Sequence, residues 1–146
     1  MQKIKKRFLF ILPLILLLAL IRNFENQLFY DPFLSYFKSN FQNLDLPDLE
    51  FKKLFFGLLL RFTMNTIVSL AIIYVVFKNI EMVKFAMLMY VLFFMILIFY
   101  LFWLVIYDQE SNKMHIFYTR RFLIQPLLLL LFLPGFYLQN KFQNKL

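Results

Sequence analysis

Hydrophobic residues along this chain gather in four long runs with few or no charges, separated by polar segments. The runs cover residues of about 8–22, 54–77, 85–107 and 122–138. Each run is continuous and does not alternate with a period of two, so it predicts a helix and not a strand. In a bilayer, a helix satisfies all its backbone hydrogen bonds internally. The pattern therefore predicts an all-α, polytopic membrane protein with four transmembrane helices in one domain, 1–146.

The first run is the shortest of the four. Its uncharged part, Phe8 to Ile21, covers about 21 Å as a helix, whereas the hydrocarbon core is roughly 30 Å thick. Pro13 lies inside it and is expected to kink the helix. A basic start followed by a short apolar run also resembles a signal peptide, but no small-residue cleavage pattern follows. We expect a retained helix; a shallow or cleaved first run would leave three spans.

The segment between the first two runs, residues 23–53, is polar and rich in aromatic residues. The spacing of Phe33, Tyr36, Phe37 and Phe41 is typical of one face of a short helix. Such a helix could lie in the membrane interface with its rings in the headgroup zone. Alternatively, the segment is an outer loop whose aromatic side chains pack on the ends of the helices.

Composition supports a membrane protein and sets its expected partners. The chain is 62% hydrophobic and 16% charged, against about 45–50% apolar and about 25% charged residues in soluble domains. Its formal net charge is +8, and the basic residues flank the apolar runs. Membrane lipid explains that arrangement better than nucleic acid does. The basic N-terminal cluster predicts that the N- and C-termini are cytoplasmic.

Residues for catalysis or metal binding are scarce. The chain has no Cys, which excludes a thiolate nucleophile, and its two glycines leave no phosphate-binding loop. Its one histidine, His115, has only Asp108 and Glu110 nearby, too few for a metal site. Nothing in the sequence orients Ser35 or Ser111 toward that histidine. We therefore expect neither an enzyme nor a cofactor.

Three polar residues fall inside the second apolar run. Arg61, Asn65 and Ser69 are four residues apart and so share one helix face. Asn65 and Ser69 are too short to reach the headgroups, and lipid offers them no hydrogen-bond partner. We therefore predict that this face points into the bundle or at a partner, with Gln125 or Asp31 as acceptors for Arg61. The alternative is that Arg61 snorkels as an anchor.

Further arginines lie near the outer ends of the predicted spans. Arg22 closes the first run, Arg120 and Arg121 open the last one, and Gln125 follows one turn further. Such a cluster could hold a phosphate or a carboxylate. For these three arginines the simpler interpretation is anchoring, in which each side chain reaches lipid phosphates.

Several segments of the chain resemble the exosortase F system-associated membrane protein family of flavobacteria. They are Phe29–Leu34, Arg61–Thr66, Ser69-Leu70, Arg121–Leu127 and Pro134–Tyr137. The length and the pattern of spans agree as well, so the resemblance covers nearly the whole chain.

The resemblance implies a neighbourhood more than a mechanism. Members of that family are encoded beside an exosortase, a membrane transpeptidase that uses Cys, Arg and His. Without a Cys, this chain cannot be the transpeptidase. The implied function is a non-enzymatic accessory protein of an exosortase-type sorting system in a bacterial inner membrane, with an exosortase-like partner. The alternatives are a membrane enzyme or carrier that handles a lipid-linked or anionic substrate through outer arginines, or a small transporter subunit.

Overall fold

The computed structural model describes residues 2–45, 47–107 and 112–145, and in this part of the chain every regular element is a helix. The all-α prediction is confirmed there. Asp108, Glu110 and Ser111, considered above beside His115, lie outside the described residues. The elements are α1 (Gln2–Asn23), α2 (Glu25–Leu28), α3 (Phe33–Lys38), the 3₁₀ turn η1 (Phe41–Asn43), α4 (Phe51–Phe77), α5 (Ile80–Tyr107), α6 (Lys113–Ile124) and α7 (Leu127–Gln143).

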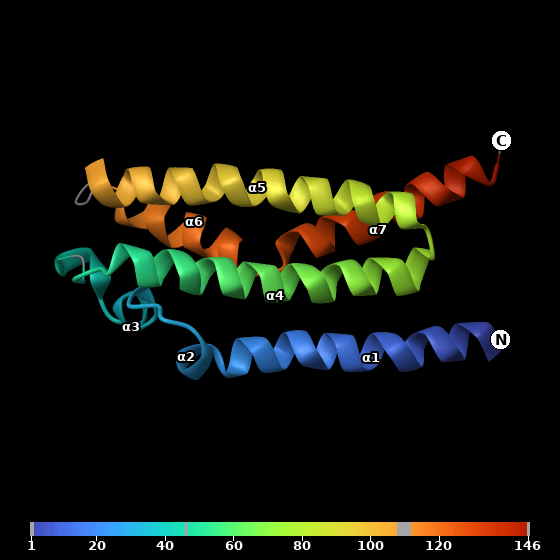
Figure 1. The fold of residues 1–146 in the computed structure, drawn as a ribbon, viewed down its shortest axis with the longest axis horizontal. Coiled ribbons are helices and arrows are strands. Elements are labelled where there is room, and N and C mark those ends of the chain that lie inside the picture. Colours follow the sequence, from blue (N-terminus) through green and yellow to red (C-terminus); the bar gives the residue numbers. More distant parts are fainter. Residues whose placement is uncertain (1, 46, 108–111, 146) are drawn as a thin grey trace.

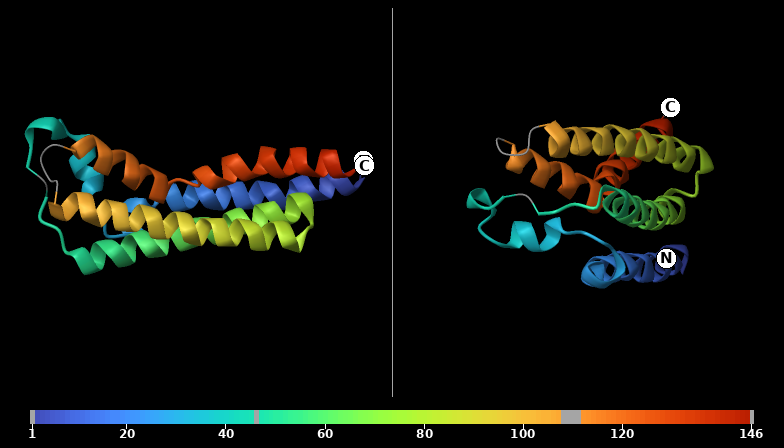
Figure 2. Two further views of the ribbon diagram at one scale, coloured as in Figure 1. Left: turned by 90° about the horizontal axis from the view of Figure 1, so that it is seen from above. Right: turned by 60° about the vertical axis from the view of Figure 1, so that its left-hand side comes forward.

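The helices form an elongated bundle around α4 (Figure 1). Helix α4 packs against α1 on one side and against α5, α6 and α7 on the other. Both termini lie at one end of the bundle, and α2 and α3 lie at the opposite end (Figures 1 and 2). An even number of passes across the bundle brings the two termini to the same end.

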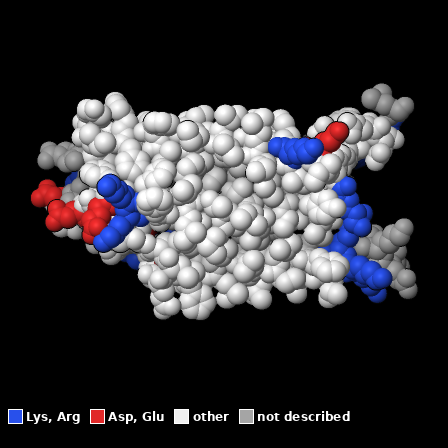
Figure 3. Space-filling view, in the orientation of Figure 1, with Lys and Arg blue, Asp and Glu red and all other residues white. Residues whose placement is uncertain are grey.

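Among the described residues, two helices are long and apolar enough to cross a membrane. These are α4, with 27 residues, and α5, with 28 residues. At ~1.5 Å per residue each exceeds the roughly 30 Å hydrocarbon core. The bent pair α6 and α7 raises the number to three if it counts as one span. Helix α1 is not among them. On the face shown in Figure 3, charged side chains gather toward the two ends of the molecule, with a broad uncharged surface between them.

The last apolar run differs from the single span expected at 122–138. Helix α6 ends at Ile124, and α7 starts at Leu127 with its axis bent by 58°. The cause is Pro126, which has no N–H to donate and disfavours helical geometry at Gln125. Gln125 is accordingly extended, with φ −101° and ψ 143°.

The connection between α4 and α5 is shorter than the expected link over residues 78–84. Lys78 takes a left-handed conformation, φ 52°, and its N–H donates to Tyr74 O at 2.7 Å. This residue caps α4. Asn79 Oδ1 then accepts the N–H of Glu81 at 2.9 Å and starts the next helix. Two residues therefore suffice to reverse the chain.

The aromatic segment packs against α6. The Phe37 ring lies 5.1 Å from that of Phe117, and the Phe41 ring lies 6.2 Å from it. Tyr36 donates its hydroxyl to the carbonyls of Phe41 and Leu44 at 3.1 and 3.0 Å. These contacts hold the segment that carries the acidic side chains described next.

Candidate functional site

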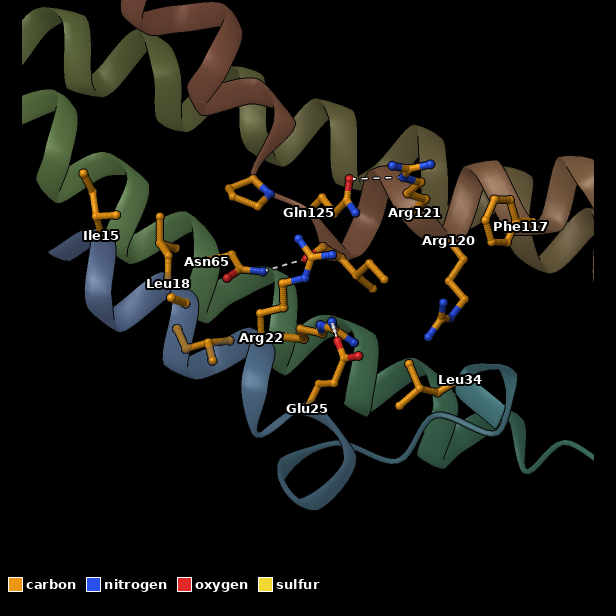
Figure 4. Close-up of a pocket in the computed structure, with 15 residues that line it drawn as sticks. Ile15, Leu18, Arg22, Glu25, Leu34, Asn65, Phe117, Arg120, Arg121 and Gln125 are labelled. Atoms are coloured by element: carbon orange, nitrogen blue, oxygen red, sulfur yellow. Dashed lines mark hydrogen bonds and ion pairs between the residues drawn. The ribbon is translucent and has the colours of Figure 1, made fainter. Parts of the chain in front are cut away.

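A pocket of about 520 Å³ lies between α1, α4 and the break between α6 and α7 (Figure 4). It occupies the half of the bundle away from the termini. Arginine, glutamate and amide side chains from these helices and from α2 converge on it. The polar lining residues are Arg22, Glu25, Arg61, Asn65, Arg120, Arg121 and Gln125. We call it the arginine pocket.

Arg61 is buried, with 3% of its surface exposed. This agrees with a face that points into the bundle and not with a snorkelling anchor. Its Nη2 donates to Glu25 Oε2 from α2, and its Nη1 lies 3.8 Å from Asp31 Oδ2. Asp31 was one of the acceptors expected for Arg61. Glu25, the closer one, was not expected, and Gln125 instead pairs elsewhere.

Arg120 and Asp31 form the best aligned ion pair of the site. Arg120 Nε donates to Asp31 Oδ2 at 3.0 Å and to Oδ1 at 3.2 Å, and its Nη2 also donates to Oδ2. Both side chains are buried, at 6% and 4% exposure. Such a fork contact is among the strongest charge-assisted hydrogen bonds. The anchoring interpretation of Arg120 is therefore wrong, because its guanidinium binds a carboxylate inside the protein.

Gly57 lets the loop that carries Asp31 approach α4. A Cβ at this position would lie 2.7 Å from the backbone oxygen of Tyr30. Gly57 precedes Arg61 by four residues and so shares its helix face. The loop that touches Gly57 thereby brings Asp31 to Arg61, and the Phe29 ring lies 5.7 Å from the Arg61 guanidinium.

Asn65 and Ser69 have different roles, although both lie on the predicted row. Asn65 Nδ2 donates to Ile124 O at 3.0 Å. That carbonyl ends α6, where the helix break leaves it without an ordinary helical partner. Ser69 is fully buried and donates to Asn65 O at 2.6 Å. Asn65 thus lines the pocket, whereas Ser69 does not.

Two exposed arginines form the rim of the pocket. Arg121 Nε donates to Gln125 Oε1 at 3.3 Å, and Arg22 extends from the end of α1 (Figure 4). Within the described part of the chain, no ion pair with an acid is found for either residue. The pairing with Gln125 places Arg121 at the pocket but leaves its guanidinium charge unbalanced.

The arginine pocket carries an excess of positive charge. Four arginines, at positions 22, 61, 120 and 121, face two carboxylates, Glu25 and Asp31, which leaves a local charge of +2. Arg61 Nε and Nη1 are buried and have no hydrogen-bond partner among the described residues. The excess comes from Arg22 and Arg121, and guanidinium groups without a carboxylate partner favour a bound anion. The arrangement can therefore bind an anion.

Of the seven polar residues singled out at the spans from the sequence, six line the pocket and Ser69 does not. Glu25 and Gly57 were missed. His115 is exposed on α6, as expected for a solvated side chain, and its Nδ1 lies 3.2 Å from the Tyr100 hydroxyl. Across the described ranges, no group of three or more His, Asp or Glu residues is placed to hold a metal ion.

In comparisons with known proteins, no family model, curated protein or solved structure matches this chain. What is established is the class: an all-helical protein with two or three helices able to cross a membrane.

Proposed function

We propose that this chain is a non-enzymatic accessory protein of a bacterial inner membrane that holds an anionic group in the arginine pocket. The observation that carries this proposal is the local charge of +2, which arises because neither Arg22 nor Arg121 has an acidic partner among the described residues. An anion supplies the acceptors that these two guanidinium groups lack.

The proposed topology has four spans, with both termini in the cytoplasm and the arginine pocket toward the outer side. It is supported by the common end of the two termini (Figure 1) and by the basic N-terminal segment. Helix α1 is then the first span, with snorkelling basic residues at its ends. Reporter fusions after Lys145 and within 79–84 should report the cytoplasm, and fusions within 40–48 the periplasm. A periplasmic signal from the 79–84 link would refute four spans.

Anion binding is tested on the purified full chain in detergent. Phosphate at saturating concentration should raise the unfolding temperature relative to sodium chloride at equal ionic strength, because a ligand of the native state stabilises it. Arg121→Gln should remove most of that increase, because it takes away one of the two arginines that have no acidic partner among the described residues. Arg121 is exposed, so its loss leaves the buried ion pairs intact. Equal unfolding temperatures in both salts, together with no response to any anionic lipid, would refute the proposal.

The resemblance to exosortase-associated proteins supplies the proposed setting, with an exosortase-like transpeptidase as partner. Copurification of the two membrane proteins from cells that express both would support an accessory role. The second candidate is a carrier or enzyme for a lipid-linked or anionic substrate. The convergence of Arg61, Arg120 and Arg121 on one pocket favours it. Turnover or transfer of such a substrate by the isolated chain would favour this candidate over the accessory role.

A further inference from the structure

The arginine pocket changes from charged to apolar along α1. Arg22 lies at its charged end, and Ile15 and Leu18 line the other end. Ile15 and Arg22 are seven positions apart, which corresponds to about 10 Å along a helix. A small inorganic ion would occupy only the charged end. A molecule with a charged head and an apolar tail would fill the whole length.

The apolar end of the pocket reaches the outer surface of the bundle. Ile15 lines the pocket and is also 54% exposed. Helix α1 packs mainly on α4, and the pocket lies along its flank beside the helix break (Figure 4). In the proposed membrane orientation, this surface faces acyl chains. A lipid could therefore enter sideways without leaving the bilayer.

The charge of the pocket matches a doubly charged head. A phosphate monoester carries about −1.5 to −2 charges at pH 7 and three strong acceptor oxygens. A carboxylate or a phosphodiester carries only about one negative charge at that pH. A phosphate monoester therefore balances the local excess charge of +2, whereas a carboxylate or a phosphodiester balances only half of it. Arg22 and Arg121 offer planar forks suited to phosphate oxygens.

We propose that the arginine pocket binds a membrane lipid through a phosphate monoester headgroup, with an acyl chain along Ile15 and Leu18. This inference rests on the proposed function, because it names the anionic group that the pocket holds. The phosphate lies between the two rim arginines, Arg22 and Arg121. Arg61 and Arg120 keep their carboxylate partners and supply the surrounding positive potential.

The first experiment compares three probes on the purified full chain. These are short-chain phosphatidate, phosphatidylcholine with the same chains, and inorganic phosphate, each titrated against the unfolding temperature. Phosphatidate should act at a concentration at least about tenfold below that of either other probe, since one charge-assisted contact is worth about a factor of ten. Arg22→Gln combined with Arg121→Gln should abolish this advantage.

Further variants separate the contribution of the lipid headgroup from that of the acyl chain. Lys38→Gln with Lys52→Gln removes two exposed charges outside the arginine pocket and should change phosphatidate affinity less than about twofold. Ile15→Trp fills the apolar end and should weaken phosphatidate at least about tenfold while leaving inorganic phosphate unchanged. Leu16→Trp, on an exposed position outside the pocket lining, should leave both unchanged.

The outcomes separate this inference from the proposed function. If inorganic phosphate and phosphatidate act at the same concentration, or Ile15→Trp has no effect, the lipid inference is overturned and anion binding stands. If phosphatidylcholine acts as well as phosphatidate, and the rim variant Arg22→Gln with Arg121→Gln responds normally, both are overturned. An equal loss in the Lys38 and Lys52 control would mean unspecific attraction and would also overturn the lipid site.

Discussion

Asp31→Asn tests whether the buried charges hold the bundle together. The substitution keeps the size of the side chain and removes its negative charge. Asp31 accepts hydrogen bonds from Arg120 Nε at 3.0 and 3.2 Å and lies 3.8 Å from Arg61 Nη1. Because only 4% of its side chain is exposed, almost no water can solvate the guanidinium groups that lose the carboxylate.

The cost follows from which partner is left behind. Arg61 keeps Glu25, but Arg120 would be buried without a carboxylate. Removing one partner of a buried ion pair costs about 3–5 kcal/mol. At about 1.4 kcal/mol per factor of ten, even the lower value changes the folding equilibrium more than a hundredfold. Removing both partners, by adding Arg120→Leu, should cost less than the single change, because no unpaired charge remains.

The assay is unfolding in detergent micelles, followed by the helical circular dichroism signal at several denaturant concentrations. The matched control is Asp48→Asn, an exposed acid in the same polar segment, which should shift stability by no more than about 0.5 kcal/mol. If Asp31→Asn proves as stable as Asp48→Asn, the Arg120–Asp31 pair contributes nothing. The account of the site would then be wrong.

Three further predictions follow from single contacts. Gly57→Ala should lower the free energy of unfolding by about 1–3 kcal/mol, because the new Cβ would lie 2.7 Å from a backbone oxygen. Gly135→Ala meets no neighbouring atom and should raise that free energy by up to about 1 kcal/mol. Unfolding in micelles compares the two variants, and equal values would exclude close packing at residue 57. Arg61→Leu should lower the amount of protein inserted in the membrane, and Arg61→Lys, which lacks the planar guanidinium, should rescue it only in part. Asn65→Leu should cause a milder loss. Full insertion and phosphate binding by Arg61→Leu would restore the anchor interpretation. His115→Ala, at an exposed position, should leave stability within about 0.5 kcal/mol and anion binding unchanged; loss of either would show that this side chain contributes to the site.

The long helices could be predicted because hydrophobicity alone identifies them. Helices α4 and α5 differ from the expected runs by a few residues at their starts, where polar residues join the helix. Helix α6 was missed. Its buried residues Ile116, Thr119, Arg120 and Leu123 recur with helical spacing, but two of the four are polar. A pattern based on apolar residues therefore assigned this segment to a polar loop.

Only those residues of the site that share a regular helical spacing could be predicted from the sequence. The row of Arg61 and Asn65 follows from a spacing of four residues within one helix. Glu25 belongs to a four-residue helix and meets Arg61 across 36 residues of sequence. No periodicity relates two such positions. Arg120 and Arg121 are chemically identical neighbours, and only the roughly 100° turn per residue of α6 directs one inward and the other to the rim.

The helix break at Pro126 connects these separate features. A continuous helix in place of α6 and α7 would engage the Ile124 carbonyl internally, and Asn65 would then lose its acceptor. The bend of 58° also turns α7 away from the line of α6. The pocket lies at this bend, beside the C-terminal half of α1 (Figure 4). Asn65 therefore satisfies the carbonyl that the break leaves free, while Arg121 and Gln125 line the opening next to it. Because the same proline produces both the free carbonyl and the bend, the hydrogen bond of Asn65 and the opening beside α1 both depend on Pro126.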